Sequence, residues 1–181
     1  MTHPHTSIGH IQMVGLHECT SNEMIDYYER NKSHLKNAMP LRSTDFYTNK
    51  YWQQQLAQYI EDFQQGKALR FVLKDEHKVV GTISFDQIVY GAFCSCYLGY
   101  ALDQDYQGQG IMTQALQFGL DYMFNTLHLN RVMANYVPEN LPSAKLLQRL
   151  GFEKEGYAKR YLKLNGVWQD HILTSLVRDT A

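Results

Sequence analysis

One short stretch of this sequence decides its fold: Tyr106-Gln107-Gly108-Gln109-Gly110-Ile111-Met112-Thr113. The residues before it, 96–102, are apolar and aromatic enough to form a buried strand. After it, apolar residues recur at helical spacing, which predicts a helix beginning near residue 111. Glycines remove side chains where a ligand must touch the backbone, and the amides of a first helical turn favour negative charge. The stretch therefore predicts a pyrophosphate-binding turn.

Glycine-rich turns are common, so other interpretations have to be compared with this one. The stretch is not a P-loop, because no Gly-Lys-Ser/Thr follows it. It is not the dinucleotide-binding Gly-x-Gly-x-x-Gly motif either, because Thr113 occupies the third glycine position. A plain strand-to-helix turn without a ligand remains open on this stretch alone. A second element, residues 140–152, favours the ligand: Asn140 caps a short helix with buried leucines, and Gly151 stops it.

Together the two elements resemble the GNAT superfamily of acetyl-CoA-dependent N-acetyltransferases. The first is similar to the family's Q/R-x-x-G-x-G/A signature, although one residue departs from the usual Gly or Ala: Gln107-x-x-Gly110-x-Met112. The second is similar to the family's N-x-x-S/A…GF element: Asn140-x-x-Ser143…Gly151-Phe152. The resemblance covers nearly the whole chain. In the later half it is strongest to the branch that acetylates ribosomal proteins on an N-terminal alanine, through residues 96–100, 131–136, 150–159 and 170–171.

This resemblance implies an α+β fold with one mixed, mostly antiparallel central sheet flanked by helices. We expect a single domain over residues 8–178 and a flexible N-terminus over residues 1–7. In such a fold the central strand and the strand after the phosphate-binding helix splay apart, and the arm of acetyl-CoA lies in the opening. The periodicity of the residues predicts the elements in this order: strand 8–14, a helix capped by Thr20 or Ser21, helix 48–65, hairpin strands 71–73 and 79–85, strand 94–102, the helix after residue 110, strand 131–137, helix 140–150, and hairpin strands 157–164 and 167–177 around Asn165-Gly166.

The resemblance also implies acetyl-CoA as co-substrate and assigns residues to it. The pyrophosphate should lie on Gln107, Gly108, Gln109, Gly110, Ile111, Met112 and Thr113, although the two glutamine side chains could simply be solvated. The pantetheine arm should meet free backbone groups of Leu98, Gly99 and Tyr100. Asn140 caps its helix and, in the family, also reaches the arm.

Two residues are candidates for catalysis, Ser143 and Asp170. Relatives with a serine three residues after the asparagine use it to protonate the leaving thiolate, and here Leu147 occupies the position at which many members carry a tyrosine donor. The alternative for Ser143 is an ordinary first-turn serine with its hydroxyl in water. No general base is obvious, because 94–102 holds no carboxylate and Leu162 stands where relatives place a glutamate. Asp170 remains as a candidate base, but it and Glu155 could equally anchor a neighbouring loop.

The missing base bears on the acceptor. An α-amine has a pKa of about 8 and a lysine side chain one of about 10.4, so water or a backbone carbonyl could suffice for the former. We therefore expect a polypeptide N-terminus, such as that of a ribosomal protein, as the acceptor. Aromatic segments could line its groove: 46–47, 51–52 and Tyr157. Alternatives are acetylation of a polyamine or an antibiotic, a module that binds acetyl-CoA without turnover, and transfer through Cys96 as a nucleophile.

The composition of the chain narrows its possible partners and its cellular compartment. With 44% hydrophobic and 19% charged residues the chain should fold, and a net charge of -1 offers no basic surface for nucleic acid. The first residues do not read as a signal peptide and no apolar run reaches membrane-spanning length, so we expect a cytoplasmic protein without membrane contact. Three cysteines suit a reducing compartment; Cys94 and Cys96 should share one face of a strand as core fillers, and we expect no metal. The oligomeric state stays open, and a dimer is one option.

Overall fold

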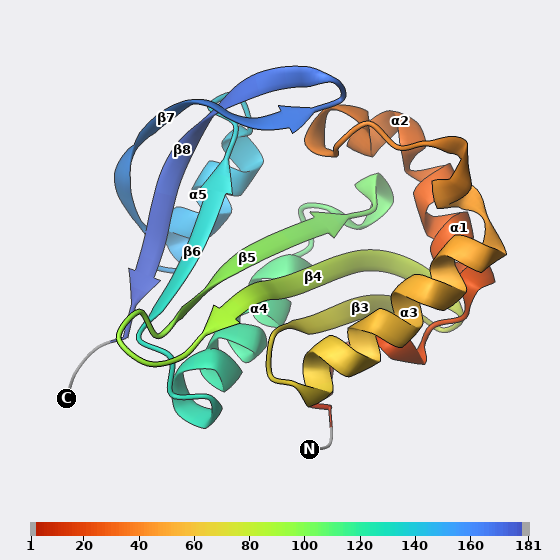
Figure 1. Ribbon diagram of the computed structural model, residues 1–181, viewed down its shortest axis with the longest axis horizontal. Coiled ribbons are helices and arrows are strands. Elements are labelled where there is room, and N and C mark those ends of the chain that lie inside the picture. Colours follow the sequence, from red (N-terminus) through yellow and green to blue (C-terminus); the bar gives the residue numbers. More distant parts are fainter. Residues whose placement is uncertain (1–2, 179–181) are drawn as a thin grey trace.

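The computed structural model describes residues 3–178, which form one eight-stranded sheet with helices on both faces (Figure 1). The order of strands in the sheet is β1-β2-β3-β4-β5-β6-β8-β7. The strands are β1 (Thr6–Ile8), β2 (Ile11–Gly15), β3 (Leu69–Asp75), β4 (Lys78–Val89), β5 (Ser95–Leu102), β6 (Arg131–Tyr136), β7 (Glu153–Leu164) and β8 (Val167–Val177). The expected mixed, mostly antiparallel sheet is confirmed, since only β5 and β6 pair in parallel among these strands.

Five α-helices and several short helical turns connect the strands. The α-helices are α1 (Ser21–Arg30), α2 (Lys32–Leu35), α3 (Asn49–Gln64), α4 (Ile111–Asp121) and α5 (Leu141–Arg149). The short turns are η1 (Leu16–Glu18), η2 (Lys36–Ala38), η3 (Thr44–Tyr47), η4 (Gln104–Tyr106) and the π-helical η5 (Tyr122–Thr126). Within residues 3–178, no helix combines the length and the apolarity needed to cross a membrane.

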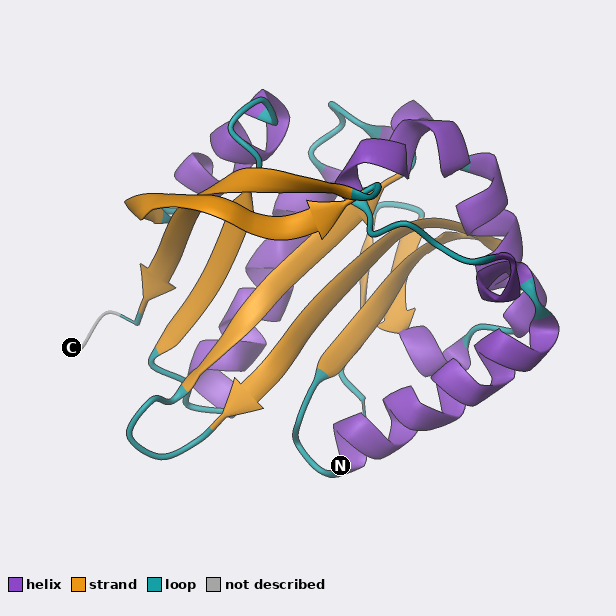
Figure 2. Ribbon diagram, turned by 45° about the horizontal axis from the view of Figure 1, so that its top comes forward, coloured by secondary structure: helices purple, strands orange, loops and turns teal. Residues whose placement is uncertain are grey.

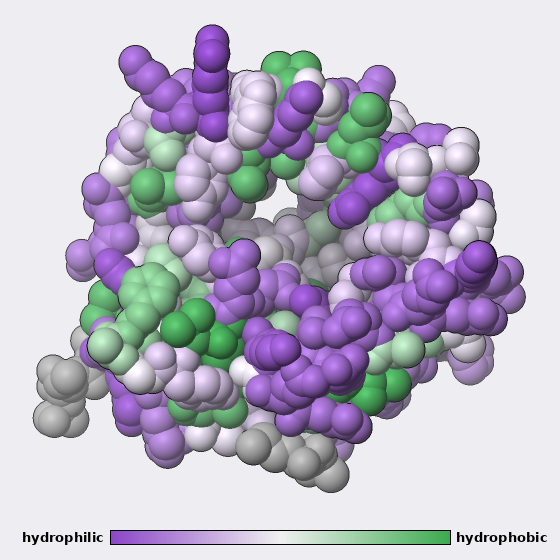
Figure 3. Space-filling model, in the orientation of Figure 1, coloured by the Kyte–Doolittle hydropathy of each residue, from purple (hydrophilic) through white to green (hydrophobic). Residues whose placement is uncertain are grey.

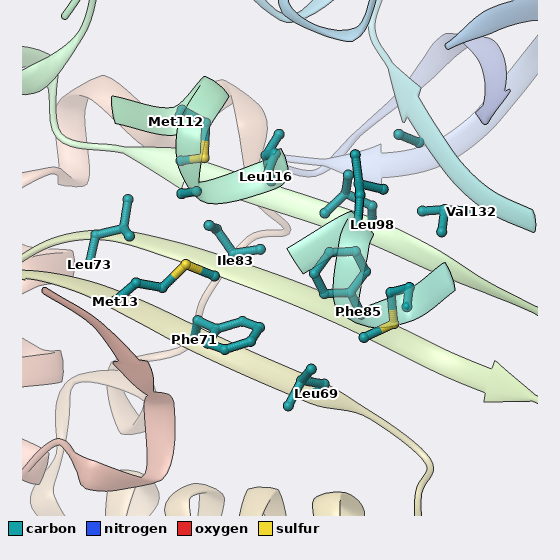
Figure 4. Packing of buried hydrophobic residues seen from close by; sticks show 14 of the residues in the cluster. Met13, Leu69, Phe71, Leu73, Ile83, Phe85, Leu98, Met112, Leu116 and Val132 are labelled. Atoms are coloured by element: carbon teal, nitrogen blue, oxygen red, sulfur yellow. The ribbon is translucent and has the colours of Figure 1, made fainter. Parts of the chain in front are cut away.

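Two apolar cores hold the helices against the sheet. On one face, side chains of β2 to β5 pack under α4, and Figure 4 shows Phe71, Phe85 and Leu98 in one cluster with Leu116. On the other face, α1 and α3 cover β3 and β4 through Tyr27, Trp52, Leu56 and other fully or nearly buried residues. Figure 2 shows the sheet between these two layers of helices. Burial of this much apolar surface is the main stabilisation of the fold.

The opening that matters for function lies between β5 and β6. Their pairing joins Ser95 with Arg131 and continues only to Tyr97 with Met133. Beyond this point β5 pairs with β4 alone and β6 pairs with β8 alone. The remaining edge of β5, from residue 98 to residue 102, is therefore free to hydrogen-bond a ligand. The expected splaying of the central strands is confirmed.

Three local expectations differ from the structure. The expected single strand over residues 8–14 is the hairpin β1–β2, because Gly9 takes a left-handed φ of 59° and reverses the chain. Within the expected flexible N-terminus, β1 begins at Thr6 and the ring of His3 packs 4.9 Å from that of Phe71, while residues 1 and 2 lie outside the described residues. Ile60, on the expected inner face of the second helix, is 39% exposed.

Candidate active site

A surface pocket, called the first hollow below, lies where the glycine-rich turn meets the N-termini of α4 and α5. Its volume is about 700 Å³. Its walls include Gln107, Gly108, Gly110, Ile111, Met112, Thr113, Asn140 and Ser143 among the residues expected at a cofactor, together with the side of β5 at Tyr100. The structure thus brings the two sequence elements, 106–113 and 140–152, to one cavity. Two expected cofactor residues, Leu98 and Gly99, line a different hollow, and Gln109 lines neither.

The glycine-rich turn is shaped for an anion. Gly108 and Gly110 have φ values of 74° and 75°, the left-handed region in which glycine meets no steric penalty. None of the amide N–H groups from Gly108 to Thr113 donates a hydrogen bond within the described part of the chain. Gly110 is also the N-cap of α4, so these amides lie at the positive end of the helix dipole. The arrangement fits a diphosphate bound through backbone groups.

Side chains around the turn add positive charge and rigidity. The amide nitrogen of Gln107 lies 3.0 Å from Nε2 of His34 and 3.4 Å from the carbonyl oxygen of Leu102. The Gln109 side chain donates to the carbonyl of Asp105 at 3.0 Å, which holds the turn itself. Lys145 and Arg149 of α5 and His34 of α2 also line this hollow. The sequence analysis did not assign these three basic residues, since their spacing carries no signature.

A second hollow, of about 530 Å³, lies on the other side of the splayed strands. Figure 3 shows the molecule hollowed in the middle of this face. Its walls come from five strands and include Asp86, Tyr97, Leu98, Gly99, Asn135, Tyr136, Tyr161, Leu162 and His171. The β7–β8 turn closes over it, because the N–H of Asn165 donates to the carbonyl oxygen of Met39 at 2.8 Å.

The two hollows meet at one pair of hydroxyl groups. Tyr100 Oη and Ser143 Oγ are 2.5 Å apart, and both residues line both hollows together with Ala38 and Asn140. Asn140 fixes the start of α5 by accepting the N–H of Ser143 at 3.1 Å on its Oδ1. Burial raises the pKa of Tyr100 to about 12, so its hydroxyl keeps its proton at neutral pH. The pair therefore places hydroxyl protons between the hollows, and the tyrosine side chain was not anticipated.

The carboxylates considered as bases are engaged elsewhere. Asp170 accepts the hydroxyl of Tyr157 at 2.5 Å and the N–H of Arg160 at 2.8 Å, and it lines neither hollow. These bonds hold its pKa below the ordinary range, the tyrosine contributing most. They brace the irregular part of β7, where Arg160 has a φ of 49°. Glu155 is paired with Arg131 at 2.5 Å. These contacts support the alternative that Asp170 and Glu155 anchor neighbouring segments.

Two further expectations need correction, and one alternative is disfavoured. Cys94 and Cys96 do not share a strand face, because β5 begins at Ser95 and Cys94 has a φ of 41°. Cys96 lies in the core under α4, and burial raises its pKa to about 12, which rules against a nucleophilic thiolate. The aromatic segments expected at a groove lie elsewhere: Phe46 and Trp52 are buried in the core that α1 and α3 form with the sheet, and Tyr157 is 51% exposed and lines neither hollow. The tyrosines of the second hollow come from β5, β6 and β7. Among residues 3–178, no three His, Cys, Asp or Glu side chains are grouped to hold a metal.

Comparison with known proteins identifies the family to which this fold and sequence belong. The family model for the acetyltransferase (GNAT) domain matches residues 15–153. The [ribosomal protein uS5]-alanine N-acetyltransferase of Escherichia coli (strain K12) is 44% identical over 163 residues, which cover 89% of this chain and 84% of that protein. The family model covers all the residues that line the first hollow, whereas Tyr161, Leu162, Leu164 and His171 of the second hollow lie beyond its end.

Solved structures agree with the sequence comparison. The ribosomal-protein-S5-alanine acetyltransferase from Vibrio fischeri superposes with a TM-score of 0.91 at 41% identity, covering 97% of each chain. Mycobacterium smegmatis RimJ, solved in complex with CoA-disulfide, superposes with a TM-score of 0.82 at 28% identity, covering 92% of this chain and 81% of that one. The chain belongs to the GNAT family of acetyltransferases.

Proposed function

We propose that this chain, as one domain over residues 8–178, transfers the acetyl group of acetyl-CoA to the N-terminal α-amine of a polypeptide. A ribosomal protein with an N-terminal alanine is the proposed acceptor, in line with the activities for which the relatives from Escherichia coli and Vibrio fischeri are named. The observation that carries the proposal is the meeting of two hollows at the Tyr100–Ser143 pair. One hollow suits the anionic end of acetyl-CoA, and the other leads an amine to the same point.

In this proposal the diphosphate of acetyl-CoA binds the free amides from Gly108 to Thr113. His34, Lys145 and Arg149 then face its remaining negative charge. The pantetheine arm follows the unpaired edge of β5 past Asn140, which brings the thioester to Leu98, Gly99 and Tyr100. A backbone N–H on this edge would polarise the acetyl carbonyl and stabilise the oxyanion that forms on attack.

The amine attacks the acetyl carbon directly in a ternary complex. A carbon–nitrogen bond forms, the carbon–sulfur bond breaks, and the departing thiolate needs a proton. Ser143 Oγ and Tyr100 Oη share one hydrogen bond, so either can donate to sulfur while the other replaces the proton. Tyr100 thereby supplies the hydroxyl that Leu147 lacks. The Leu147 side chain, on α5, is 1% exposed and packs in the core. Asp170 is proposed to brace β7 instead of acting as a base.

The shape of the second hollow favours a slender acceptor. The contact between Asn165 and Met39 bridges the β7–β8 turn to the segment after α2, so the acceptor passes beside this bridge on its way to Tyr100. An extended N-terminal tail can take such a path. Besides Tyr100 and Ser143, six walls are tyrosine, serine or asparagine side chains, which can bind backbone groups of a peptide: Ser84, Tyr97, Asn135, Tyr136, Asn140 and Tyr161.

The test is the site of acetylation on a peptide that begins with alanine and contains internal lysines. The purified chain and acetyl-CoA should yield one acetyl group on the α-amine, located by fragment mass spectrometry. Acetyl on lysine side chains only, or on spermidine only in a mixture of both acceptors, would contradict the acceptor and leave the family membership standing. Binding of acetyl-CoA without any turnover would favour a non-catalytic module.

A further inference from the structure

The second hollow contains a histidine whose surroundings suit proton transfer. His171 lies on β8 and is only 3% exposed, yet it lines this hollow beside Tyr136, Val137 and Leu162. Its ring lies 5.2 Å from the ring of Tyr161, which restricts its orientation. A buried imidazole on the wall of an acceptor site is a common choice for general base.

The hydrogen bond of the first ring nitrogen decides which nitrogen is basic. Nδ1 of His171 lies 3.2 Å from the backbone carbonyl oxygen of Gln169. A carbonyl oxygen can only accept, so Nδ1 carries the proton and Nε2 carries the lone pair of the neutral ring. Nε2 has no hydrogen-bond partner among the described residues. The hydroxyl of Ser95 also lacks a partner but is fully buried, whereas Nε2 of His171 is not. The lone pair is thus available to a molecule in the hollow.

The other acid–base groups of the hollow are less free. Asp86, the single carboxylate among its walls, is paired with Arg70 at 2.5 Å, and the same Arg70 binds Asp62 at 2.8 Å. The hydroxyl of Tyr161 accepts a hydrogen bond from Asn135 at 3.0 Å. The remaining titratable walls are tyrosines of β5 and β6, and Asp170, next to His171 on β8, is held by Tyr157 and Arg160.

We propose that His171 is the general base for the acceptor amine, a role that rests on the proposed N-terminal acetylation. Nε2 takes one proton from the ammonium group, and the neutral amine then attacks the acetyl carbon. As the carbon–sulfur bond breaks, the Tyr100–Ser143 pair gives a proton to the thiolate. The second proton of the amine returns to this pair through water, and the imidazolium releases its proton to solvent. One proton leaves per acetyl group transferred.

The sharpest variant is His171→Asn. The amide nitrogen of asparagine reproduces the Nδ1 donor to Gln169 but provides nothing in place of Nε2, so a purely structural histidine would be replaced well. Asp86→Asn tests the rival base in the same hollow. His10→Asn is the matched control, because the His10 side chain is 71% exposed on the β1–β2 turn and lines neither hollow.

The measurement is kcat/KM for the alanine-initiated peptide between about pH 6 and about pH 10, with acetyl-CoA affinity measured separately. For His171→Asn we expect a loss of about 10²-fold near pH 7, unchanged acetyl-CoA affinity, and a rate that now rises with a pKa near 8, that of the free amine. The wild type and His10→Asn should rise at lower pH.

Three results would overturn the proposal. The first is a His171→Asn profile with the wild-type shape, whether the rate is intact or uniformly reduced. The second is the same loss of the low-pH limb in Asp86→Asn but not in His171→Asn. The third is loss of acetyl-CoA affinity in His171→Asn, which would point to a structural role. A wild type without peptide turnover would instead refute the proposed acceptor, so the two failures are distinguishable.

Discussion

The two hollows that meet at Tyr100 and Ser143 are built in different ways. The first uses backbone amides from one contiguous turn and helix N-terminus, residues 108–113. The second uses side chains delivered by five strands, from Ser84 on β4 to His171 on β8. Backbone groups recognise a chemical feature that every acyl-CoA shares, whereas scattered side chains recognise one acceptor. Changes in the first hollow should therefore alter cofactor binding, and changes between or beyond the hollows should alter the chemistry.

The largest effect is expected for Gly110→Val. A β-branched residue is strained at a φ of 75°, and its side chain would stand where the diphosphate approaches the amides. We expect acetyl-CoA to bind roughly 10²-fold more weakly, about 2.7 kcal/mol, in a protein that still folds. Titration calorimetry measures this directly.

Gly91→Val is the matched control for backbone strain. Gly91 has a φ of 78° and, like Gly110, no crowding atom close to an added Cβ, but it lies in the β4–β5 turn away from both hollows. It should lose stability without losing affinity. Wild-type affinity for acetyl-CoA in a folded Gly110→Val protein would refute the binding of the diphosphate by the glycine-rich turn.

The next effect concerns the hydroxyl pair between the hollows. Ser143→Ala should lower kcat by roughly 10²-fold, with little change in the KM for acetyl-CoA, because the hydroxyl acts on the leaving thiolate. Tyr100→Phe should have a similar effect, since the two hydroxyls form one donor unit. The double variant should then lose much less than the product of the single losses.

The outcome of this cycle separates a catalytic pair from a structural one. Strictly multiplicative losses would mean that the hydroxyls act independently. A kcat within about threefold of wild type for folded Ser143→Ala would assign its hydroxyl a structural role only.

Smaller effects are expected from the basic side chains of the first hollow. Lys145→Ala and Arg149→Ala should each weaken acetyl-CoA binding by roughly 1.4-fold to 5-fold, the range for exposed charge pairs of about 0.2–1 kcal/mol. The difference should shrink at high salt, because exposed charges are screened. Lys154→Ala on β7, which lines neither hollow, is the control and should bind normally. If salt changed acetyl-CoA binding equally in the Lys145, Arg149 and Lys154 variants, the proposed contact of Lys145 and Arg149 with acetyl-CoA would be refuted.

The smallest catalytic effect is expected for Asp170→Asn. Tyr157 and the N–H of Arg160 hold the pKa of this carboxyl below its ordinary value, so the stabilisation is present above about pH 4 and is lost as pH falls through the lower folded value. The variant should melt earlier than wild type at neutral pH, and the two should converge in acid. Its kcat should stay within about threefold of wild type; a far larger loss of kcat would restore Asp170 as a catalytic group.

Much of the first hollow could be predicted from the sequence, because its residues are consecutive and carry a signature. Gly108 and Gly110 signal a left-handed turn, and Asn140 and Gly151 mark the two ends of α5. The periodicities of the strands and helices also predict most of the sheet. The turn at Gly9 and the irregular start of β5 at Cys94 were missed, and the expected strands 71–73, 79–85 and 157–164 are longer in the structure.

The second hollow could not be predicted, because it depends on long-range pairing. Gln169 faces Leu162 across β7 and β8, and this register places His171 in the same wall. The contact of Tyr100 with Ser143 joins residues 43 positions apart. No local spacing records such contacts. Of the aromatic positions that looked suitable for a groove, Phe46 and Trp52 fill the core that α1 and α3 form with the sheet, and Tyr157 lies exposed on β7.

The most direct test of the whole account is a crystal structure with a bisubstrate analogue, an alanine-initiated peptide joined through its α-amine and an acetyl bridge to the sulfur of CoA. We expect the diphosphate on the amides from Gly108 to Thr113, the sulfur within hydrogen-bonding distance of Ser143 Oγ or Tyr100 Oη, and the peptide in the second hollow beside His171. A peptide that leaves along another surface, or a sulfur remote from both hydroxyls, would contradict the claim that the two hollows meet at the site of transfer.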